Sequence, residues 1–144
     1  MNKDDASTTA LQRPTDFFTA DEIAYLRKVD SQRSWLAVAH CWAVIVGTWI
    51  VVSIFPNPIT ITLGVMIIGA RQLGLFVLTH DGAHGSLFKN RKLNDWVCEW
   101  ILNRPFTDEK IDNYRKYHVV HHANTQQEND PDLVLSKPFP ITKS

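Results

Sequence analysis

The sequence predicts an all-α membrane protein, in which a transmembrane helical hairpin is joined to cytoplasmic interfacial helices that carry clusters of histidine. Three observations lead to this class. Two long apolar runs follow one another with only a proline-containing turn between them. A segment after the second run has the apolar spacing of an amphipathic helix. Five of the six histidines lie in two short stretches with helical spacing.

The composition narrows the range of partners. Lys plus Arg and Asp plus Glu number 15 each, so the net charge indicates no nucleic-acid partner. The length of 144 residues is enough for one modest domain. The two cysteines lie in unlike surroundings, Cys41 in an apolar run and Cys98 in a helical segment with polar flanks. This favours a reducing compartment over a disulfide.

The amino-terminal part is predicted to have two sections. Residues 1–18 form a disordered tail, because nearly all of this stretch is polar and without periodicity. A helix is predicted from about residue 20 to residue 30. Thr19 can cap its first turn, and Glu22 stands three residues on, as in a capping box. This helix is expected to lie on the membrane surface ahead of the first span.

Two candidate membrane spans come next, at about 35–55 and 59–79. The first run contains no Asp, Glu, Lys or Arg. A bilayer core of about 30 Å is crossed by roughly 20 helical residues, so each run is long enough. The sequence "PNP" at 56–58 separates them, and two prolines around an asparagine favour a turn. The pair therefore predicts a hairpin with a very short loop.

Two alternatives compete with the membrane hairpin. A signal peptide would not begin 35 residues into the chain, without a small-residue cleavage site, and lead directly into a second apolar run. A pair of buried helices in a soluble protein would also explain the two runs, and the sequence leaves that alternative open.

Basic residues predict the orientation of the hairpin. The turn between the spans has no charge, whereas both outer flanks are basic. The positive-inside rule therefore places both flanks, both histidine clusters and both termini in the cytoplasm. The basic residues of the flanks are Arg27, Lys28, Arg33, Lys89, Arg91 and Lys92.

A further helix is predicted in "LNDWVCEWI" at 93–101. Its apolar residues recur at i, i+3, i+4, i+7 and i+8, which makes one stripe. The stripe consists of Leu93, Trp96, Val97, Trp100 and Ile101. Asp95 and Glu99 lie off the stripe. Since tryptophan suits the membrane–water interface, this helix is expected along the cytoplasmic surface. An amphipathic helix packed on the core is the alternative.

Arg71 interrupts the second span beside Gln72. A charge inside a bilayer is costly and normally faces the protein interior or extends to the interface. Arg71 is therefore expected to have a structural role, either by extending toward the cytoplasm or by pairing with a carboxylate such as Glu99.

The histidine clusters predict a metal site. Residues three or four apart share one face of a helix, so each cluster can present its imidazoles together. Imidazole nitrogen suits iron, zinc, copper and nickel. The predicted ligands are His80 and His84 in the first cluster and His118, His121 and His122 in the second. His40, isolated inside the first span, is not expected to bind metal.

Residues beside the first cluster have two interpretations each. Asp81 can orient a histidine, because metal-bound imidazoles usually donate their other N–H to a carboxylate or carbonyl. It can equally be an ordinary charge at a helix end. Gly82 and Gly85 either allow close approach of another backbone or end the helix.

The stretches "HDGAH" at 80–84 and "HVVHH" at 118–122 resemble the first two histidine boxes, HxxxH and HxxHH, of membrane fatty acid desaturases. The surrounding "GAHGSLFKNRKLNDWVCEW" and "YRKYHVVHHANTQQENDPDL" look like bacterial members of that family, and the similarity covers roughly 35–140. The resemblance implies a desaturase domain over 19–144, located in a bacterial inner membrane.

The resemblance also implies a chemistry. It implies a histidine-ligated di-iron centre that uses O₂ to introduce a double bond into an acyl-lipid or acyl-CoA. Electrons would come from a donor such as ferredoxin or a cytochrome b5-type protein. On the family pattern the five clustered histidines would be iron ligands, with Asp81 behind them. Zinc has no redox chemistry and could not support this reaction.

The resemblance has one departure. The family has a third HxxHH box far downstream and usually two more spans, and this sequence contains neither. The chain is therefore expected to be an amino-terminal fragment, with a partial desaturase domain.

Three other functions stay open. Carotenoid and alkane hydroxylases use related boxes, although the HxxxH spacing favours acyl desaturation. A membrane zinc peptidase would need HExxH, where Asp81 now replaces the glutamate, and the second cluster would then have no role. An inactive truncated metal-binding membrane protein is the third alternative.

Overall fold

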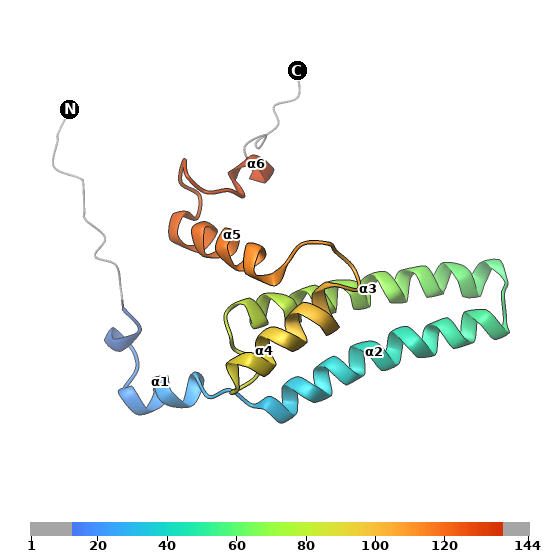
Figure 1. Cartoon of the computed structure of the whole chain (residues 1–144), viewed down its shortest axis with the longest axis horizontal. Coiled ribbons are helices and arrows are strands. Elements are labelled where there is room, and N and C mark those ends of the chain that lie inside the picture. Colours follow the sequence, from blue (N-terminus) through green and yellow to red (C-terminus); the bar gives the residue numbers. More distant parts are fainter. Residues whose placement is uncertain (1–12, 137–144) are drawn as a thin grey trace, which may run out of the picture.

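The computed structural model describes residues 13–136. Over that range the chain forms helices and no strand (Figure 1), so the predicted all-α class is confirmed. Residues 1–12 of the predicted disordered tail and the proline-containing end at 137–144 lie outside the described residues. The last part of the predicted tail includes a short 3-10 turn, η1 (Pro14–Asp16).

The first helix, α1 (Ala20–Leu26), begins where the sequence predicts. The backbone N–H of Glu22 donates to the Thr19 hydroxyl at 3.3 Å, and the Glu22 carboxylate accepts from the Thr19 backbone at 2.8 Å, which completes a capping box. The predicted end of this helix at Asp30 is wrong. The Asp30 carboxylate accepts from the first backbone N–H groups of the next helix, and so begins that helix instead.

Two long helices, α2 (Ser31–Ile54) and α3 (Pro58–Ala83), confirm the predicted hairpin (Figure 1). The Asn57 side chain caps α3 by accepting two backbone N–H groups at 3.1 Å. Pro58 occupies the first turn of α3, where its missing N–H is not needed. Because α3 runs beyond the predicted span end, His80 lies inside the last turn of the helix.

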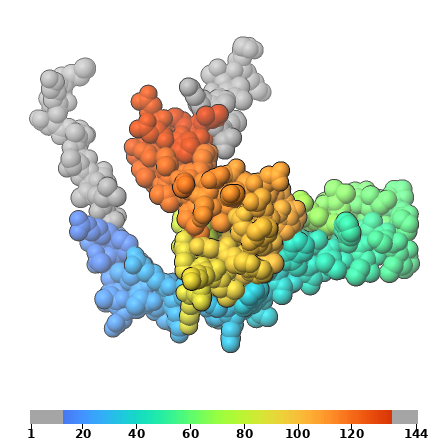
Figure 2. Space-filling model, in the orientation of Figure 1, coloured from blue at the N-terminus to red at the C-terminus, as the bar shows by residue number. Residues whose placement is uncertain are grey.

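Both hairpin helices are long and apolar enough to cross a membrane. In their most apolar windows only 17% and 11% of the residues are buried, whereas a core helix of a soluble protein would be mostly covered. The closed end of the hairpin projects beyond the other elements (Figure 2). The apolar surface of the hairpin therefore faces outward, as contact with lipid requires.

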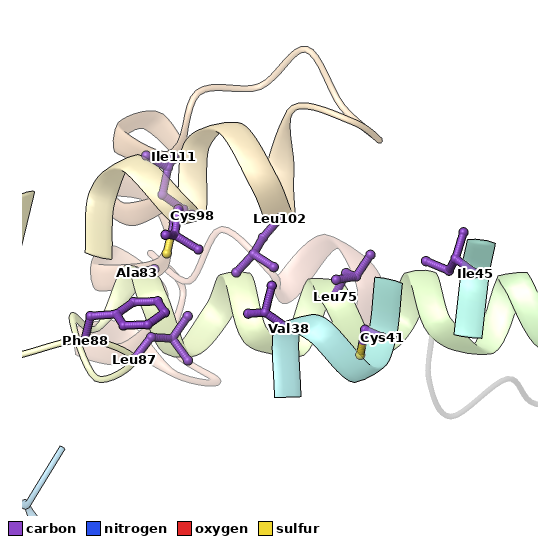
Figure 3. Packing of buried hydrophobic residues seen from close by; sticks show 11 residues of the cluster. Val38, Cys41, Ile45, Leu75, Ala83, Leu87, Phe88, Cys98, Leu102 and Ile111 are labelled. Carbon is purple, nitrogen blue, oxygen red and sulfur yellow. The ribbon is translucent and has the colours of Figure 1, made fainter. Parts of the chain in front are cut away.

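A further helical layer packs across the half of the hairpin that lies away from its closed end. It consists of α4 (Arg91–Val97) and a π-helix, η2 (Cys98–Asn103). Trp42 on α2 donates its indole N–H to the Ile101 carbonyl at 3.3 Å. The core lies where these helices meet (Figure 3), and its buried apolar residues are Val38, Cys41, Ile45, Leu75, Ala83, Leu87, Phe88, Val97, Cys98, Leu102 and Ile111.

The predicted apolar stripe of this layer divides into two faces. Val97 is fully buried and Ile101 packs against the core, whereas Leu93, Trp96 and Trp100 remain exposed. The inward face is completed by residues off the stripe, and Asn94 and Cys98 are both 0% exposed. One face therefore holds the core, and the second presents two tryptophans outward, where a membrane interface would meet them.

Both glycines after the first cluster have a structural reason. A Cβ on Gly82 would overlap the Cys98 sulfur, so Gly82 permits close approach of η2 to α3. Gly85 has a φ of +73°, a left-handed conformation that suits glycine just past a helix end. Gly82 therefore serves close packing, and Gly85 serves helix termination.

Of the two alternatives for Arg71, pairing with Glu99 is not found among the described residues. The Glu99 carboxylate accepts from Arg104 Nε at 2.7 Å and from the Ile111 backbone N–H at 2.8 Å. Burial opposes ionisation of Glu99, but these two hydrogen bonds, together with the charges of Arg104 and Lys110, outweigh it and lower the pKa of the carboxyl group. Glu99 thereby caps the next helix, α5 (Ile111–Asn124), from a distant position in the sequence. A short helix, α6 (Leu133–Ser136), ends the described chain.

Candidate metal centre

The candidate site lies where the end of α3 meets α5. His80 is in the last turn of α3, and His84 is the residue at its C-cap. His118 and His122 lie one turn apart on α5, so their side chains share a face. Two sequence-distant segments thus contribute two imidazoles each.

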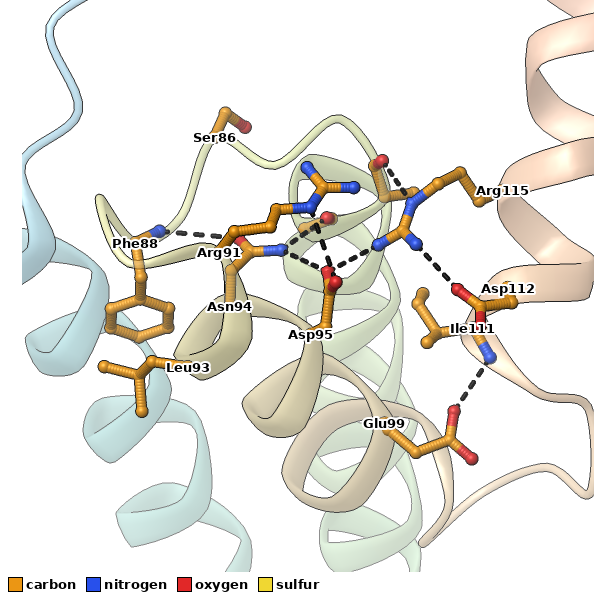
Figure 4. A network of polar contacts seen from close by, with 12 residues as sticks. Ser86, Phe88, Arg91, Leu93, Asn94, Asp95, Glu99, Ile111, Asp112 and Arg115 are labelled. Atoms are coloured by element: carbon orange, nitrogen blue, oxygen red, sulfur yellow. Dashed lines mark hydrogen bonds and ion pairs between the residues drawn. The ribbon is translucent and has the colours of Figure 1, made fainter.

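A polar network holds these two helices together (Figure 4). Arg115 on α5 donates to three acceptors: the Ala83 carbonyl at 2.9 Å, the Asp95 carboxylate at 2.6 Å and the Asp112 carboxylate at 2.7 Å. Ala83 immediately precedes His84, and Arg115 lies one turn before His118. The guanidinium therefore sets the distance between the two histidine clusters.

Asn94 supports this network from the core (Figure 4). Its amide donates to the Gly82 carbonyl at 2.8 Å and to Asp95 at 3.1 Å, while its oxygen accepts from the Phe88 backbone at 3.4 Å. A fully buried amide that is satisfied on both sides rigidifies its surroundings. The turn after α3 is held in place in this way.

Four imidazoles converge at the site. Ring nitrogens of His80, His84, His118 and His122 all lie within 4.8 Å of one another. Nε2 of His118 is 3.0 Å from Nε2 of His84 and 2.9 Å from Nε2 of His122. Metal–nitrogen bonds of ~2.1 Å at right angles place two ligand nitrogens about 3 Å apart. The cluster therefore fits one first-row metal ion, and we call it the four-histidine cluster.

The surroundings of His118 and His84 favour the neutral form of both rings. Burial, followed by the neighbouring imidazoles, lowers the pKa of His118 to about 4. The pKa of His84 is lowered as well, by burial and then by His80 and His122. A neutral imidazole has a nitrogen lone pair that a metal can use. The Tyr114 ring stacks on His118 at 5.4 Å and excludes water from one side.

His121 is placed apart from the four-histidine cluster, although the sequence put it in the same ligand set. Its Nδ1 lies 2.7 Å from the Asp130 carboxylate and 3.2 Å from that of Asp132. The hydrogen bond to Asp130, together with the charge of both carboxylates, raises the pKa of His121 against burial. Its assignment as an iron ligand stays a prediction.

The two remaining candidates have weaker positions. Asp81 approaches His80 Nδ1 at 3.4 Å, which is a long contact between two partly exposed groups. His40 is exposed on α2 and belongs to neither group of nearby histidines and carboxylates. Asp81 is therefore adjacent to the site, and His40 lies outside it.

Two residues of the site, Asp130 and Arg115, were not predicted from the sequence. The signal for Asp130 was present as "NDPD" at 129–132, because Asp-Pro pairs build turns that can return toward a preceding helix. Arg115 lies one turn ahead of the second cluster, but its three acceptors come from elements that only the fold brings together.

Comparison with protein families explains why these residues occur together. The family model for fatty acid desaturase matches residues 56–142, which is more than half of the chain. No curated protein and no solved structure matches the chain. Together with the apolar hairpin, the match indicates a membrane protein with a desaturase-type function. The chain belongs to the fatty acid desaturase family.

Proposed function

We propose that the four-histidine cluster binds iron and serves an O₂-dependent desaturation of an acyl chain in the membrane. One observation carries this proposal: imidazoles from segments 34 residues apart converge, with Nε2 of His84 and Nε2 of His118 3.0 Å apart and Nε2 of His122 2.9 Å from the latter. The family match gives this donor set its reaction class.

The roles of individual residues follow from their positions. His80, His84, His118 and His122 would hold one iron, and His121 would contribute to a second iron in a di-iron centre. Bound iron would supply the redox chemistry that removes two hydrogens from an unactivated chain. The low pKa of His118 keeps its ring neutral, so this ligand need not lose a proton before it binds metal.

The setting of the reaction is part of the same proposal. The substrate would be an acyl-lipid or acyl-CoA, whose chain reaches the metal from the apolar side. The electron donor would be a ferredoxin or a cytochrome b5-type protein. The location would be a bacterial inner membrane, and the basic flanks of the hairpin support an orientation with both histidine clusters in the cytoplasm.

Two alternatives are weaker on specific grounds. A zinc peptidase would use only the first cluster, whereas His118 lies in contact with His84 and shares its site. A related carotenoid or alkane hydroxylase has no observation in its favour beyond the shared boxes. An inactive metal-binding protein remains distinguishable by experiment.

The test combines metal counting with lipid analysis. The chain is expressed in a membrane host, purified in detergent without chelators and analysed for iron and zinc. His118→Ala should remove most of the bound iron, while His40→Ala, on the same hairpin but outside the cluster, should retain it. New double bonds in host lipids, detected by mass spectrometry, would establish desaturation. Iron-free protein or a stoichiometric zinc ion would contradict the proposal.

A further inference from the structure

The segment after α5 returns to the helix and holds one histidine. Residues 125–132 place the Asp130 carboxylate, whose side chain is 0% exposed, against His121. This carboxylate accepts three hydrogen bonds: from His121 Nδ1 at 2.7 Å, from the Gln126 backbone at 2.7 Å and from the Asp132 backbone at 2.9 Å. Two backbone N–H groups therefore hold the Asp130 carboxylate in place, in addition to its contact with the imidazole.

The loop conformation depends on the same carboxylate. Gln126 has a φ of 61°, a left-handed conformation that is uncommon outside glycine. Its backbone N–H points to Asp130. Strained backbone of this kind persists only where surrounding contacts hold it, and it clusters at functional sites. The loop conformation therefore places the Asp130 carboxylate against Nδ1 of His121.

The contact has a consequence for the other nitrogen of the ring. An acceptor at Nδ1 keeps the proton of the neutral ring on that atom, so the lone pair of Nε2 is left for another partner. In the described part of the chain, His121 Nε2 has no hydrogen-bond partner. The His121 ring lies 5.7 Å from the ring of His122, which belongs to the four-histidine cluster.

We propose that Asp130 is a positioning residue that holds His121 with Nε2 free to ligate a second metal beside the four-histidine cluster. The proposal rests on the proposed function for the metal, but its first part concerns the metal-free chain alone. Asp132 is the matched control. It lies farther from His121 Nδ1, at 3.2 Å, its side chain is 34% exposed, and it is engaged by the Tyr117 hydroxyl.

The first measurement is ¹⁵N NMR of the metal-free chain with labelled histidines, in detergent, with the pH raised until the His121 signals no longer change. His121→Gln assigns the His121 signals. The wild-type ring should be protonated at Nδ1. Asp130→Asn replaces a carboxylate oxygen with an N–H group and should move the proton to Nε2, at least in part. Asp130→Glu should restore the wild-type tautomer, and Asp132→Asn should keep it.

A merely structural role for Asp130 predicts a different result. In that case the His121 tautomer would be unchanged in Asp130→Asn, and this outcome would overturn the proposal. Unchanged signals from the four-histidine cluster show that each variant is folded. A globally altered spectrum for Asp130→Asn, with Asp130→Glu still showing the Nε2-protonated ring, would also count against it.

The second measurement is a Co²⁺ titration followed by visible absorption. Asp130→Asn and His121→Gln should lose the same weaker binding step and retain the tighter one, and the double variant should lose nothing more. Additive losses would overturn the positioning role. If the wild type binds no metal at all, the proposed function fails, while the tautomer measurement still decides the role of Asp130.

Discussion

The guanidinium of Arg115 donates to the carboxylate of Asp95 across 2.6 Å, and this ion pair joins α5 to α4 (Figure 4). Both groups are partly buried, and Arg115 also reaches the last carbonyl of α3. The two histidine clusters therefore meet because one side chain bridges three helices.

Arg115→Gln should weaken both the fold and the metal site. Loss of a charged hydrogen-bond donor from a partly buried network costs about 2 kcal/mol. Thermal unfolding of the metal-free chain in detergent measures the loss, and Fe²⁺ titration should show reduced affinity. Arg33→Gln is the control, because its ion pair with Asp30 is exposed and should change either quantity little. Equal effects of the two substitutions would contradict the bridging role.

Gly82→Ala should destabilise the protein by about 1–3 kcal/mol, since its methyl group would overlap the Cys98 sulfur. Gly69→Ala on the same helix is the matched control. Nothing lies near its added methyl group, and alanine is the better helix former, so it should be neutral or stabilising. Chemical unfolding of both variants checks the difference. Recovery of part of the loss in Gly82→Ala with Cys98→Ala would identify the sulfur as the obstacle.

Cys98 should resist alkylation in the folded protein. Its thiol is 0% exposed, and burial, followed by the charge of Asp95, raises its pKa to about 12. The thiolate that reacts is therefore nearly absent at neutral pH. In a Cys41→Ser background, mass spectrometry after iodoacetamide treatment should show no adduct until denaturant is added. A Ser86→Cys variant, exposed in the loop after α3, should react at once, and rapid native labelling of Cys98 would refute its burial.

The metal-free protein should lose stability as the pH falls below 6.5 toward 4. The folded pKa of His118 is about 4, whereas an unperturbed histidine titrates near 6.5. The unfolded chain therefore binds the proton more tightly in this window, and each step toward acid favours unfolding. His118→Gln should flatten the dependence of the melting temperature on pH between these values. His121 has a raised pKa, so its contribution to stability is fully present below about 6.5 and is lost as the pH rises above that value. His121→Gln should therefore leave the slope between 6.5 and 4 unchanged and flatten the dependence above 6.5.

Local patterns predicted most of the fold. The charge-free runs predicted the two hairpin helices, because bilayer thickness and helical rise alone set the length that is needed. The capping box at Thr19 was predictable since its donors and acceptors are three residues apart. The spacing of His80 with His84, and of His118 with His122, predicted shared faces for the same reason.

Only the tertiary structure decided the contacts between segments distant in sequence. The apolar stripe at 93–101 did not decide which side of the helix would be buried. Val97 and Cys98 are buried, with the Cys98 sulfur close to Gly82, whereas Trp96 and Trp100 are exposed. Helical spacing alone grouped His121 with His118 and His122, but in the structure its ring contacts Asp130 in the following loop. Periodicity states which residues share a helix face. Periodicity does not state which face is buried or which imidazole nitrogen stays free for a metal. Both depend on residues distant in sequence, which come into contact only when the helices pack.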